Sequence, residues 1–229
     1  MPSFSTQRSA LRGIGTELAA LLLAASCAGC GEPSELLCAV CRAQLTAAGP
    51  VATVTPHGLV VQAALSFDGV AARCIRRLKG EGETLLARVL GRVLAPVLDA
   101  ALTSGALVVP VPTSRAAFRA RGYRVPDLLA RRAGAVPVPL LAPAVERADQ
   151  RGLDVRERRE NVRGSMRARR RGAGVRIVLL DDVVTTGATL DEAARALTEA
   201  GFDVVSAVAL AATPRHRRLI EDSSATRRK

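Results

Sequence analysis

The chain has 229 residues, 48% of them hydrophobic and only 2% aromatic, so it can bury one sizeable core built mainly from alanine, valine and leucine. Its formal net charge of +12 comes almost entirely from arginine, because Lys79 and Lys229 are the only lysines. This charge favours anionic partners (nucleotides, phosphosugars, nucleic acid or acidic membrane surfaces), although genome-wide composition bias explains an arginine-rich chain equally well. The scarcity of aromatic side chains excludes an extended base-stacking platform for single-stranded nucleic acid.

The first segment, residues 1–24, is predicted to be a helix. Its apolar run over residues 18–25 follows Arg8 and Arg12 and superficially resembles an export signal. The run is short, and cleavage at Cys27 would divert one member of a four-cysteine set, so we expect a cytoplasmic protein. No segment of the sequence reaches the length of a membrane-spanning helix.

Residues 25–45 carry a cysteine module with two CxxC pairs. Two such turns can deliver four thiolates to one tetrahedral ion, so the arrangement predicts a structural zinc site rather than disulfides. A redox role is the main alternative for a single CxxC, but the duplication weakens it. The predicted Zn²⁺ ligands are Cys27, Cys30, Cys38 and Cys41. The remaining cysteine, Cys74, lies in a helical pattern and is expected in the core.

The rest of the chain alternates between strand and helix patterns. Residues 49–67 predict a hairpin or meander, and buried strands are predicted over residues 106–111, 175–180 and 204–210. Helices are predicted from residue 68 onward and over residues 84–101, 127–133 and 190–200. Pro96 is expected to kink or break the second of them. Near-continuous apolar strands that alternate with helices indicate an α/β domain whose parallel sheet is covered on both faces.

The predicted organisation has three parts. Residues 1–48 form the N-terminal helix and the zinc-ribbon-like module, residues 49–213 form the α/β domain, and residues 214–229 form a basic, disordered tail.

The most informative stretch follows the predicted strand over residues 175–180. Two adjacent carboxylates, Asp181 and Asp182, precede a loop rich in threonine that leads into a helix. Ligands of open α/β sheets lie at the carboxyl ends of strands, and a helix N-terminus offers unpaired N–H groups and a favourable dipole to a phosphate. The carboxylates would repel that phosphate unless they accept hydrogen bonds from ribose hydroxyls, a task that a bound Mg²⁺ can share. The loop residues are Thr185, Thr186, Gly187, Ala188 and Thr189.

An ordinary strand-to-helix turn is the simplest alternative for this stretch. Such a turn accounts for one threonine and one aspartate but not for the whole set. Two common nucleotide-binding motifs do not fit either, because the Gly-Lys pair of a Walker A loop and the GxGxxG dinucleotide fingerprint are both absent.

This stretch closely resembles the motif that binds 5-phosphoribosyl-1-pyrophosphate (PRPP) in type I phosphoribosyltransferases. The resemblance implies a phosphoribosyltransferase-type sheet in which Asp181 and Asp182, the catalytic candidates, contact the ribose hydroxyls. It further implies that residues 185–189 wrap the 5-phosphate and that Mg²⁺ accompanies PRPP. The wider pattern resembles the ComF/GntX-like group through the paired CxxC module followed by residues 76–80, 109–112, 121–123, 150–153 and 158–162.

The resemblance also implies a pyrophosphate-binding loop and a flap. The candidates for the first are Pro112, Thr113, Ser114 and Arg121, although a rigid proline-rich turn and a surface arginine fit the same residues. Residues 146–165 resemble a mobile flap that closes over PRPP, and a charged, solvated helix is the alternative. Three departures from the family, at residues 123–125, Gly80 and Met166, leave the acceptor open.

Three functions fit this pattern. The leading hypothesis is an enzyme that transfers the phosphoribosyl group of PRPP to an unidentified acceptor and releases pyrophosphate. The second is a regulator that binds PRPP or a nucleotide on the same fold without turnover. The third is an accessory of competence-type DNA uptake, with DNA or the uptake machinery as partner, which a salt-sensitive DNA affinity would support.

Overall fold

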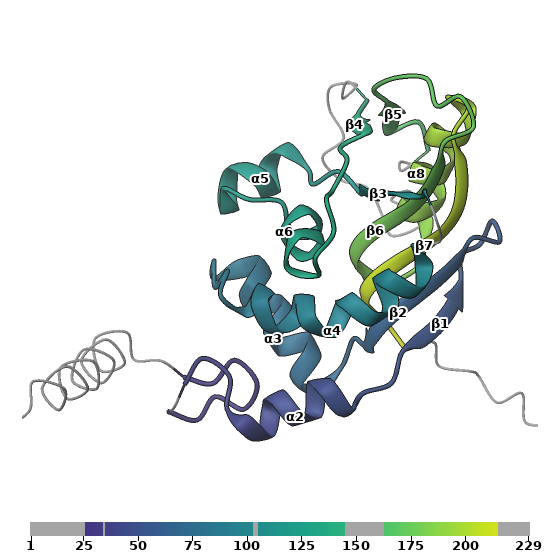
Figure 1. Ribbon diagram of the computed structural model, residues 1–229. Helices are drawn as coiled ribbons and strands as arrows, with labels where there is room; N and C mark the ends of the chain where they lie inside the picture. Colours follow the sequence, from purple (N-terminus) through teal and green to yellow (C-terminus); the bar gives the residue numbers. More distant parts are fainter. Residues whose placement is uncertain (1–25, 34, 103–104, 145–162, 215–229) are drawn as a thin grey trace, which may run out of the picture.

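A computed structural model describes residues 26–33, 35–102, 105–144 and 163–214. Its centre is a five-stranded sheet in the order β1-β2-β7-β6-β3 (Figure 1). Strands β2, β7, β6 and β3 run parallel, and β1 pairs antiparallel with β2. The strands are β1 (Val51–Val54), β2 (Val60–Ser66), β3 (Leu107–Pro110), β6 (Arg176–Val184) and β7 (Asp203–Ala212). The predicted α/β class and the hairpin predicted over residues 49–67 are confirmed.

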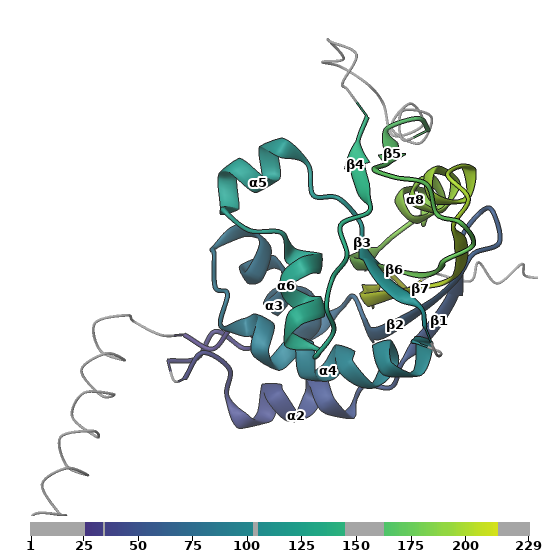
Figure 2. The same ribbon diagram turned by 45° about the horizontal axis from the view of Figure 1, so that its top comes forward.

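Helices cover both faces of this sheet (Figures 1 and 2). On one face α4 contacts β2 and β7, and α6 contacts β3 and β6; on the other, α8 contacts β6 and β7. Helices α2 and α3 pack on each other and on α4, so they extend the first of these two layers. The helices are α2 (Ala39–Ala47), α3 (Gly69–Gly80), α4 (Leu86–Ala101), α5 (Arg115–Arg121), α6 (Val125–Arg132) and α8 (Ala188–Glu199).

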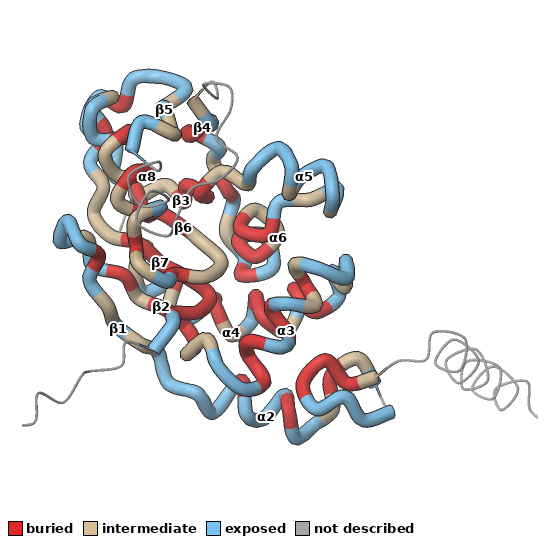
Figure 3. The backbone as a smooth tube through the Cα atoms, turned by 180° about the vertical axis from the view of Figure 1, so that it is seen from behind, coloured by how far each residue is buried: buried red, intermediate tan, exposed pale blue. Residues whose placement is uncertain are grey.

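The alternation of side chains along β6 divides the core into two layers. Val178 and Leu180 are buried with α3, α4 and α6, whereas Ile177 and Leu179 are buried with α8. Successive residues of a strand point to opposite faces, so a strand covered on both faces is apolar throughout. Cys74 is fully buried in the first layer, as predicted, and burial raises the pKa of its thiol to about 11. Figure 3 shows buried residues along the strands and on α4 and α6, while α5 is largely exposed.

Several elements differ from the prediction, and three of them have a definite physical reason. Helix α4 continues through Pro96, so the predicted break is wrong, because leucines buried along the whole length of α4 hold both of its halves in the core. Strand β6 runs on to Val184 instead of ending at Leu180, since β7 pairs with it that far. Helix α5 is absent from the prediction because it has seven residues and buries none of them, so the sequence carries no apolar periodicity there.

A second sheet pairs β4 (Leu141–Pro143) antiparallel with β5 (Met166–Ala168). These strands flank the segment predicted as a flap, of which residues 146–162 lie outside the described residues. The predicted N-terminal helix and all of the predicted tail except Pro214 lie outside them as well, and the three-part division of the chain stays a prediction. Among the helices of the described ranges, none combines the length and the apolar character needed to cross a membrane.

Candidate functional site

The predicted phosphate loop lies where β6 passes into α8. Strand β6 ends at Val184, and α8 begins at Ala188 directly after Gly187. Gly187 has a φ of 84°, a left-handed conformation that costs other residues strain. The first turn of α8 leaves its backbone N–H groups without intrahelical partners, and the helix dipole adds positive potential there. This end of α8 is therefore suited to bind an anion.

The paired acids lie near the end of β6, and strand alternation directs their side chains to opposite faces. Asp182 continues the face of Leu180, and its Oδ1 accepts a hydrogen bond from Lys79 Nζ at 2.7 Å. Asp181 continues the face of Leu179, and its Oδ1 accepts from the backbone N–H of Asp182 at 2.8 Å. Burial, reinforced by the neighbouring Asp182 carboxylate, raises the pKa of Asp181 to about 7. Lys79 is not among the predicted site residues.

The turn between β1 and β2 packs against the predicted phosphate loop and the first turn of α8. Thr55 is buried, and its hydroxyl donates to Asp191 Oδ1 in the first turn of α8 while accepting from Leu59 N at 3.0 Å. His57 Nδ1 lies 2.9 Å from Asp191 Oδ2. A Cβ placed on Gly187 would come within 2.8 Å of Thr55 Cγ2. The hairpin turn, α8 and the loop therefore pack as one unit, although Thr55, His57 and Asp191 are not among the predicted site residues.

We expect Gly187→Ala to weaken phosphate binding and to lower the free energy of unfolding by about 1–3 kcal/mol, because the new methyl group meets Thr55 and the left-handed φ is strained. Urea unfolding and titration with ribose 5-phosphate would measure both effects. The matched control is Gly174→Ala, since Gly174 has a φ of 77° but nothing within 4 Å of its added Cβ. Equal stability losses in the two variants would show that the contact with Thr55 contributes nothing.

The predicted pyrophosphate residues lie at the same edge of the sheet as the acids. Strands β3 and β6 are parallel neighbours, and Val111 N donates to Leu180 O at 2.8 Å just before the loop of residues 112–114. Ser114 caps α5, since its hydroxyl accepts from Ala117 N at 3.2 Å. Arg121 lies at the other end of α5, and its Nη1 donates to Lys79 O at 3.4 Å. The loop and the acids are therefore adjacent, and Arg121 reaches the end of α3.

Helix α8 also holds the chain where the described residues resume after the predicted flap. The buried Glu192 accepts from Met166 N at 3.0 Å, and Arg195 Nε donates to Glu192 Oε2 at 2.7 Å. Although burial acts in the opposite direction, the hydrogen bonds from Arg195 lower the pKa of Glu192, so its carboxylate stays charged. Strand β5 is thus tied to α8 by hydrogen bonds, from Met166 N to Glu192 and from Arg195 Nη2 to Met166 O, that no sequence motif indicated.

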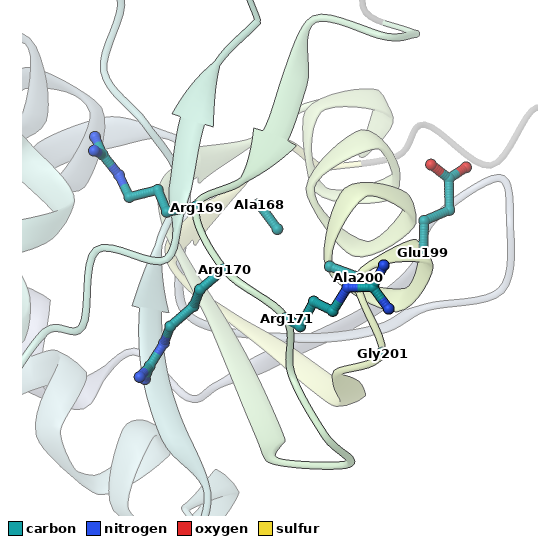
Figure 4. A pocket seen from close by; sticks show the side chains of 7 residues that line it. All are labelled: Ala168, Arg169, Arg170, Arg171, Glu199, Ala200 and Gly201. Atoms are coloured by element: carbon teal, nitrogen blue, oxygen red, sulfur yellow. The ribbon is translucent and has the colours of Figure 1, made fainter.

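Two hollows open beside α8. A groove of about 1250 Å³ runs between the β1–β2 hairpin and α8, and residues Thr185 and Thr186 of the phosphate loop help to line it. A smaller cavity of about 510 Å³ lies at the far end of α8 beside three consecutive arginines, residues 169–171. In Figure 4 the side chains of Arg169 and Arg170 point away from the end of α8, whereas Arg171 extends toward Ala200. Because these guanidinium groups diverge, they do not enclose an anion.

The four predicted zinc ligands, Cys27, Cys30, Cys38 and Cys41, lie together. The first two are in a tight turn, Cys38 caps α2, and Cys41 is in the first turn of α2. All four Sγ atoms lie within 4.8 Å of one another, and those of Cys30 and Cys38 are 3.9 Å apart. Four sulfurs bound tetrahedrally at a Zn–S distance of about 2.3 Å are separated by about 3.8 Å. The cluster therefore fits one zinc ion.

The surroundings of Cys27 favour its thiolate. The N–H groups of Gly29 and Cys38 donate to Cys27 Sγ at 3.4 and 3.3 Å. Although burial acts in the opposite direction, hydrogen bonds from the backbone of Cys38, Cys30 and Gly29 lower the pKa of Cys27 to about 6. Thiolate sulfur is the form that binds a metal.

Helix α3 joins the cysteine turn to the rest of the chain. Arg73 Nε donates to Gly29 O, and Arg77 Nη1 donates to Ser26 O at 3.0 Å. The side chains of Leu37 and Leu45 enter the same core layer as α3. The module thus docks on the helix that carries Lys79.

Comparison with known proteins finds a family model and two relatives that this chain resembles. Residues 121–227 match the family model described as "Phosphoribosyl transferase domain". The chain is 31% identical over 150 residues to competence protein F of Haemophilus influenzae, covering 60% of this chain and 66% of that protein. It is 35% identical over 109 residues to an orotate phosphoribosyltransferase of Rhizorhabdus wittichii, covering 45% of this chain and 55% of that protein. The chain therefore spans somewhat less than two thirds of one relative and about half of the other.

A solved adenine phosphoribosyltransferase superposes on 75% of this chain and 89% of its own length, with a TM-score of 0.40 and 13% identity. At that TM-score the superposition adds nothing to the assignment, which rests on the observed parallel sheet and on the family model.

The parallel sheet and the matching family model show that residues 121–227 of this chain form a phosphoribosyl transferase domain. The match to competence protein F confirms the predicted likeness to the ComF/GntX-like group. Strands β1, β2 and β3 precede the matched residues yet belong to the same sheet, so the folded unit is larger than the matched range.

Proposed function

We propose that this chain binds PRPP with Mg²⁺ and transfers its phosphoribosyl group to an acceptor with release of pyrophosphate. The observation that carries the proposal is the acid pair at the end of β6, followed by a loop that turns through the left-handed Gly187 into the N-terminus of α8. In this proposal residues 185–189 bind the 5-phosphate, and Asp181 and Asp182 accept hydrogen bonds from the ribose hydroxyls. Residues 112–114 and Arg121 bind the diphosphate.

The reaction would break the bond between C1 of PRPP and a diphosphate oxygen while a nucleophilic atom of the acceptor forms a new bond to C1. Pyrophosphate leaves with both electrons of the broken bond, so stabilising its negative charge is the main catalytic task. Carboxylate oxygens are the donors that Mg²⁺ prefers, which fits the chemistry of Asp181 and Asp182. When bound with PRPP, Mg²⁺ would neutralise part of the diphosphate charge.

The direct test is pyrophosphate release from Mg·PRPP in the presence of a panel of acceptors that includes orotate and adenine. We expect release with one class of acceptor and none without it. Micromolar PRPP binding without release by any acceptor would favour the alternative, a PRPP-binding regulator that does not turn over.

The raised pKa of Asp181 predicts that the free energy of unfolding depends on pH. Because its pKa is raised from 3.8 to about 7 in the folded chain, the folded state binds more protons than the unfolded state between these values. The free energy of unfolding should therefore fall as pH rises from about 4 to 7, by on the order of 1–4 kcal/mol, and then level off. Urea unfolding at pH 5 and pH 8 would measure this fall. The stability of Asp181→Asn relative to the unsubstituted chain should be greater at pH 8 than at pH 5. The same stability difference between the two proteins at both pH values would contradict the raised pKa of Asp181.

A DNA-binding accessory role is a second candidate because exposed arginines cluster in and directly after β5, and the relative from Haemophilus influenzae is named competence protein F. Arg167, Arg169 and Arg170 are all exposed, and no acidic residue lies between Arg163 and Arg176. A DNA affinity that falls steeply with salt, and that drops when these three arginines become glutamine, would support this role. A salt-insensitive or absent affinity would remove it.

A further inference from the structure

Lys79 lies in the last turn of α3 and is the only lysine in the part of the chain that the structure describes. Its Nζ donates to Asp182 Oδ1 at 2.7 Å. The Asp182 side chain is only 13% exposed, but the Lys79 side chain is 33% exposed. The ammonium group therefore stands at the rim of the site, where a ligand in solution can reach it.

The backbone of Lys79 is held by the segment that follows the predicted pyrophosphate loop. Arg121 Nη1 donates to Lys79 O at 3.4 Å, and the Tyr123 hydroxyl donates to Leu78 O. These bonds satisfy carbonyls that the end of a helix leaves without partners. They also bring the end of α5 against the end of α3. Lys79 thus lies between the acid pair of β6 and the segment proposed to bind the diphosphate.

Arg121 retains capacity for a further hydrogen bond. Its Nε is buried and has no hydrogen-bond partner among the described residues. A buried donor without a partner costs free energy, and an anion or a water bound beside it would remove that cost. Arg121 and Lys79 together therefore provide two cationic groups at the ends of two neighbouring helices.

We infer that Lys79 is a binding residue of this site that donates to the diphosphate of PRPP, while Asp182 holds its ammonium group in place before the ligand arrives. The inference rests on the proposed function, because it concerns the same ligand. The single positive charge of Lys79 cannot neutralise both carboxylates of the acid pair. A bound diphosphate would add further negative charge on the side of Lys79 that is accessible to solvent. Hydrogen bonds between charged partners are the strong ones, so the loss of this one should be measurable.

The test is calorimetric titration of the full-length, zinc-replete chain with three probes: Mg·PRPP, Mg·pyrophosphate and ribose 5-phosphate. We expect Lys79→Met to weaken the binding of Mg·PRPP and Mg·pyrophosphate by about 10- to 100-fold and to change that of ribose 5-phosphate by less than about threefold. Lys79→Arg keeps the positive charge and should restore pyrophosphate binding to within about tenfold of the original. The matched control is Arg76→Met, which removes one exposed charge from the same helix and should leave all three affinities unchanged.

A role limited to positioning Asp182 gives a different result. Lys79→Met would then weaken ribose 5-phosphate and PRPP equally and leave pyrophosphate binding intact, which overturns the inference. If the unsubstituted chain binds pyrophosphate and PRPP, and Lys79→Met binds them equally well, only the inference fails. If the unsubstituted chain binds none of the three probes, the proposed function fails with it.

A second readout does not depend on affinity. The chain has two lysines, Lys79 and Lys229, so protein labelled with ¹³C at lysine Cε gives two NMR signals, and Lys79→Met identifies one of them. We expect pyrophosphate to shift the Lys79 signal and leave the other in place. A Lys79 signal that does not move at saturating pyrophosphate contradicts direct contact.

Discussion

Replacing both acids of β6 with asparagine should abolish Mg·PRPP binding while leaving the chain folded. Asparagine keeps the shape of each side chain but loses its charge and presents an NH₂ group where the ribose hydroxyls need an acceptor. A hydrogen bond to a charged group is worth about 1.5–3 kcal/mol, so losing two of them predicts a loss of affinity of about 10²- to 10⁴-fold. Calorimetry with Mg·PRPP at pH 8 would measure it, because Asp181 is ionised there in the original chain.

The fold should survive this double substitution. The partly buried Asp181 carboxylate is unfavourable when charged, as its raised pKa indicates, so its neutral replacement should not destabilise the sheet. The matched control is Asp203→Asn, which removes a carboxylate that is 59% exposed and lies 3.9 Å from Arg176 at the opposite end of β6. Affinity in the double variant within threefold of the original would remove the acid pair from the site and with it the basis of the proposed function.

Removing the predicted zinc ion from the cysteine module should cost the chain a large part of its stability. Without an ion, only hydrogen bonds to sulfur hold the four Sγ atoms within 4.8 Å of one another, and thiolates at that spacing repel. The module carries Leu37, Cys41 and Leu45 into the main core, so its loosening exposes apolar surface. We expect Cys30→Ser to lower the free energy of unfolding by about 3–5 kcal/mol and the melting temperature by about 10 °C or more.

Two measurements separate this effect from a simple packing defect. Cys30 is exposed, so its replacement leaves no cavity, and the number of zinc ions per chain should fall from one to zero. Cys74→Ala is the control, because it removes a buried thiol outside the cluster and should retain one zinc ion per chain. Full stability of the original chain in a strong chelator, with no zinc detected in either protein, would refute the metal site. Because Arg73 and Arg77 tie the module to α3, we also expect chelation to weaken PRPP binding through Lys79.

Patterns that act over a few neighbouring residues can be read from the amino-acid sequence. The strand, the acid pair, the turn through Gly187 and the start of α8 occupy one short stretch, and its chemistry follows from local rules about helix ends and strand ends. The cysteine pairs are similar, since the CxxC turn itself brings two thiolates together. The covered parallel sheet follows from the alternation of apolar strands with helices.

Contacts between distant segments cannot be read in this way. Lys79 and Asp182 are separated by 103 residues, and Thr55 and Asp191 by 136, so no spacing in the sequence links them. Pro96 could not be recognised as tolerated within α4, because its tolerance depends on the leucines that hold both halves of the helix in the core. The end of β6 could not be predicted from the sequence either, because it is set by pairing with β7.

The sequence by itself determined the α/β class of this protein and the positions of the predicted phosphate loop and the predicted cysteine ligands, because hydrogen bonding at a helix end and thiolate spacing in a turn are local properties. Only the tertiary structure decided which cation faces the acid pair, what supports the phosphate loop and how the cysteine module reaches the site. Those contacts depend on how two helical layers pack on one sheet, and packing brings together residues that the chain keeps far apart.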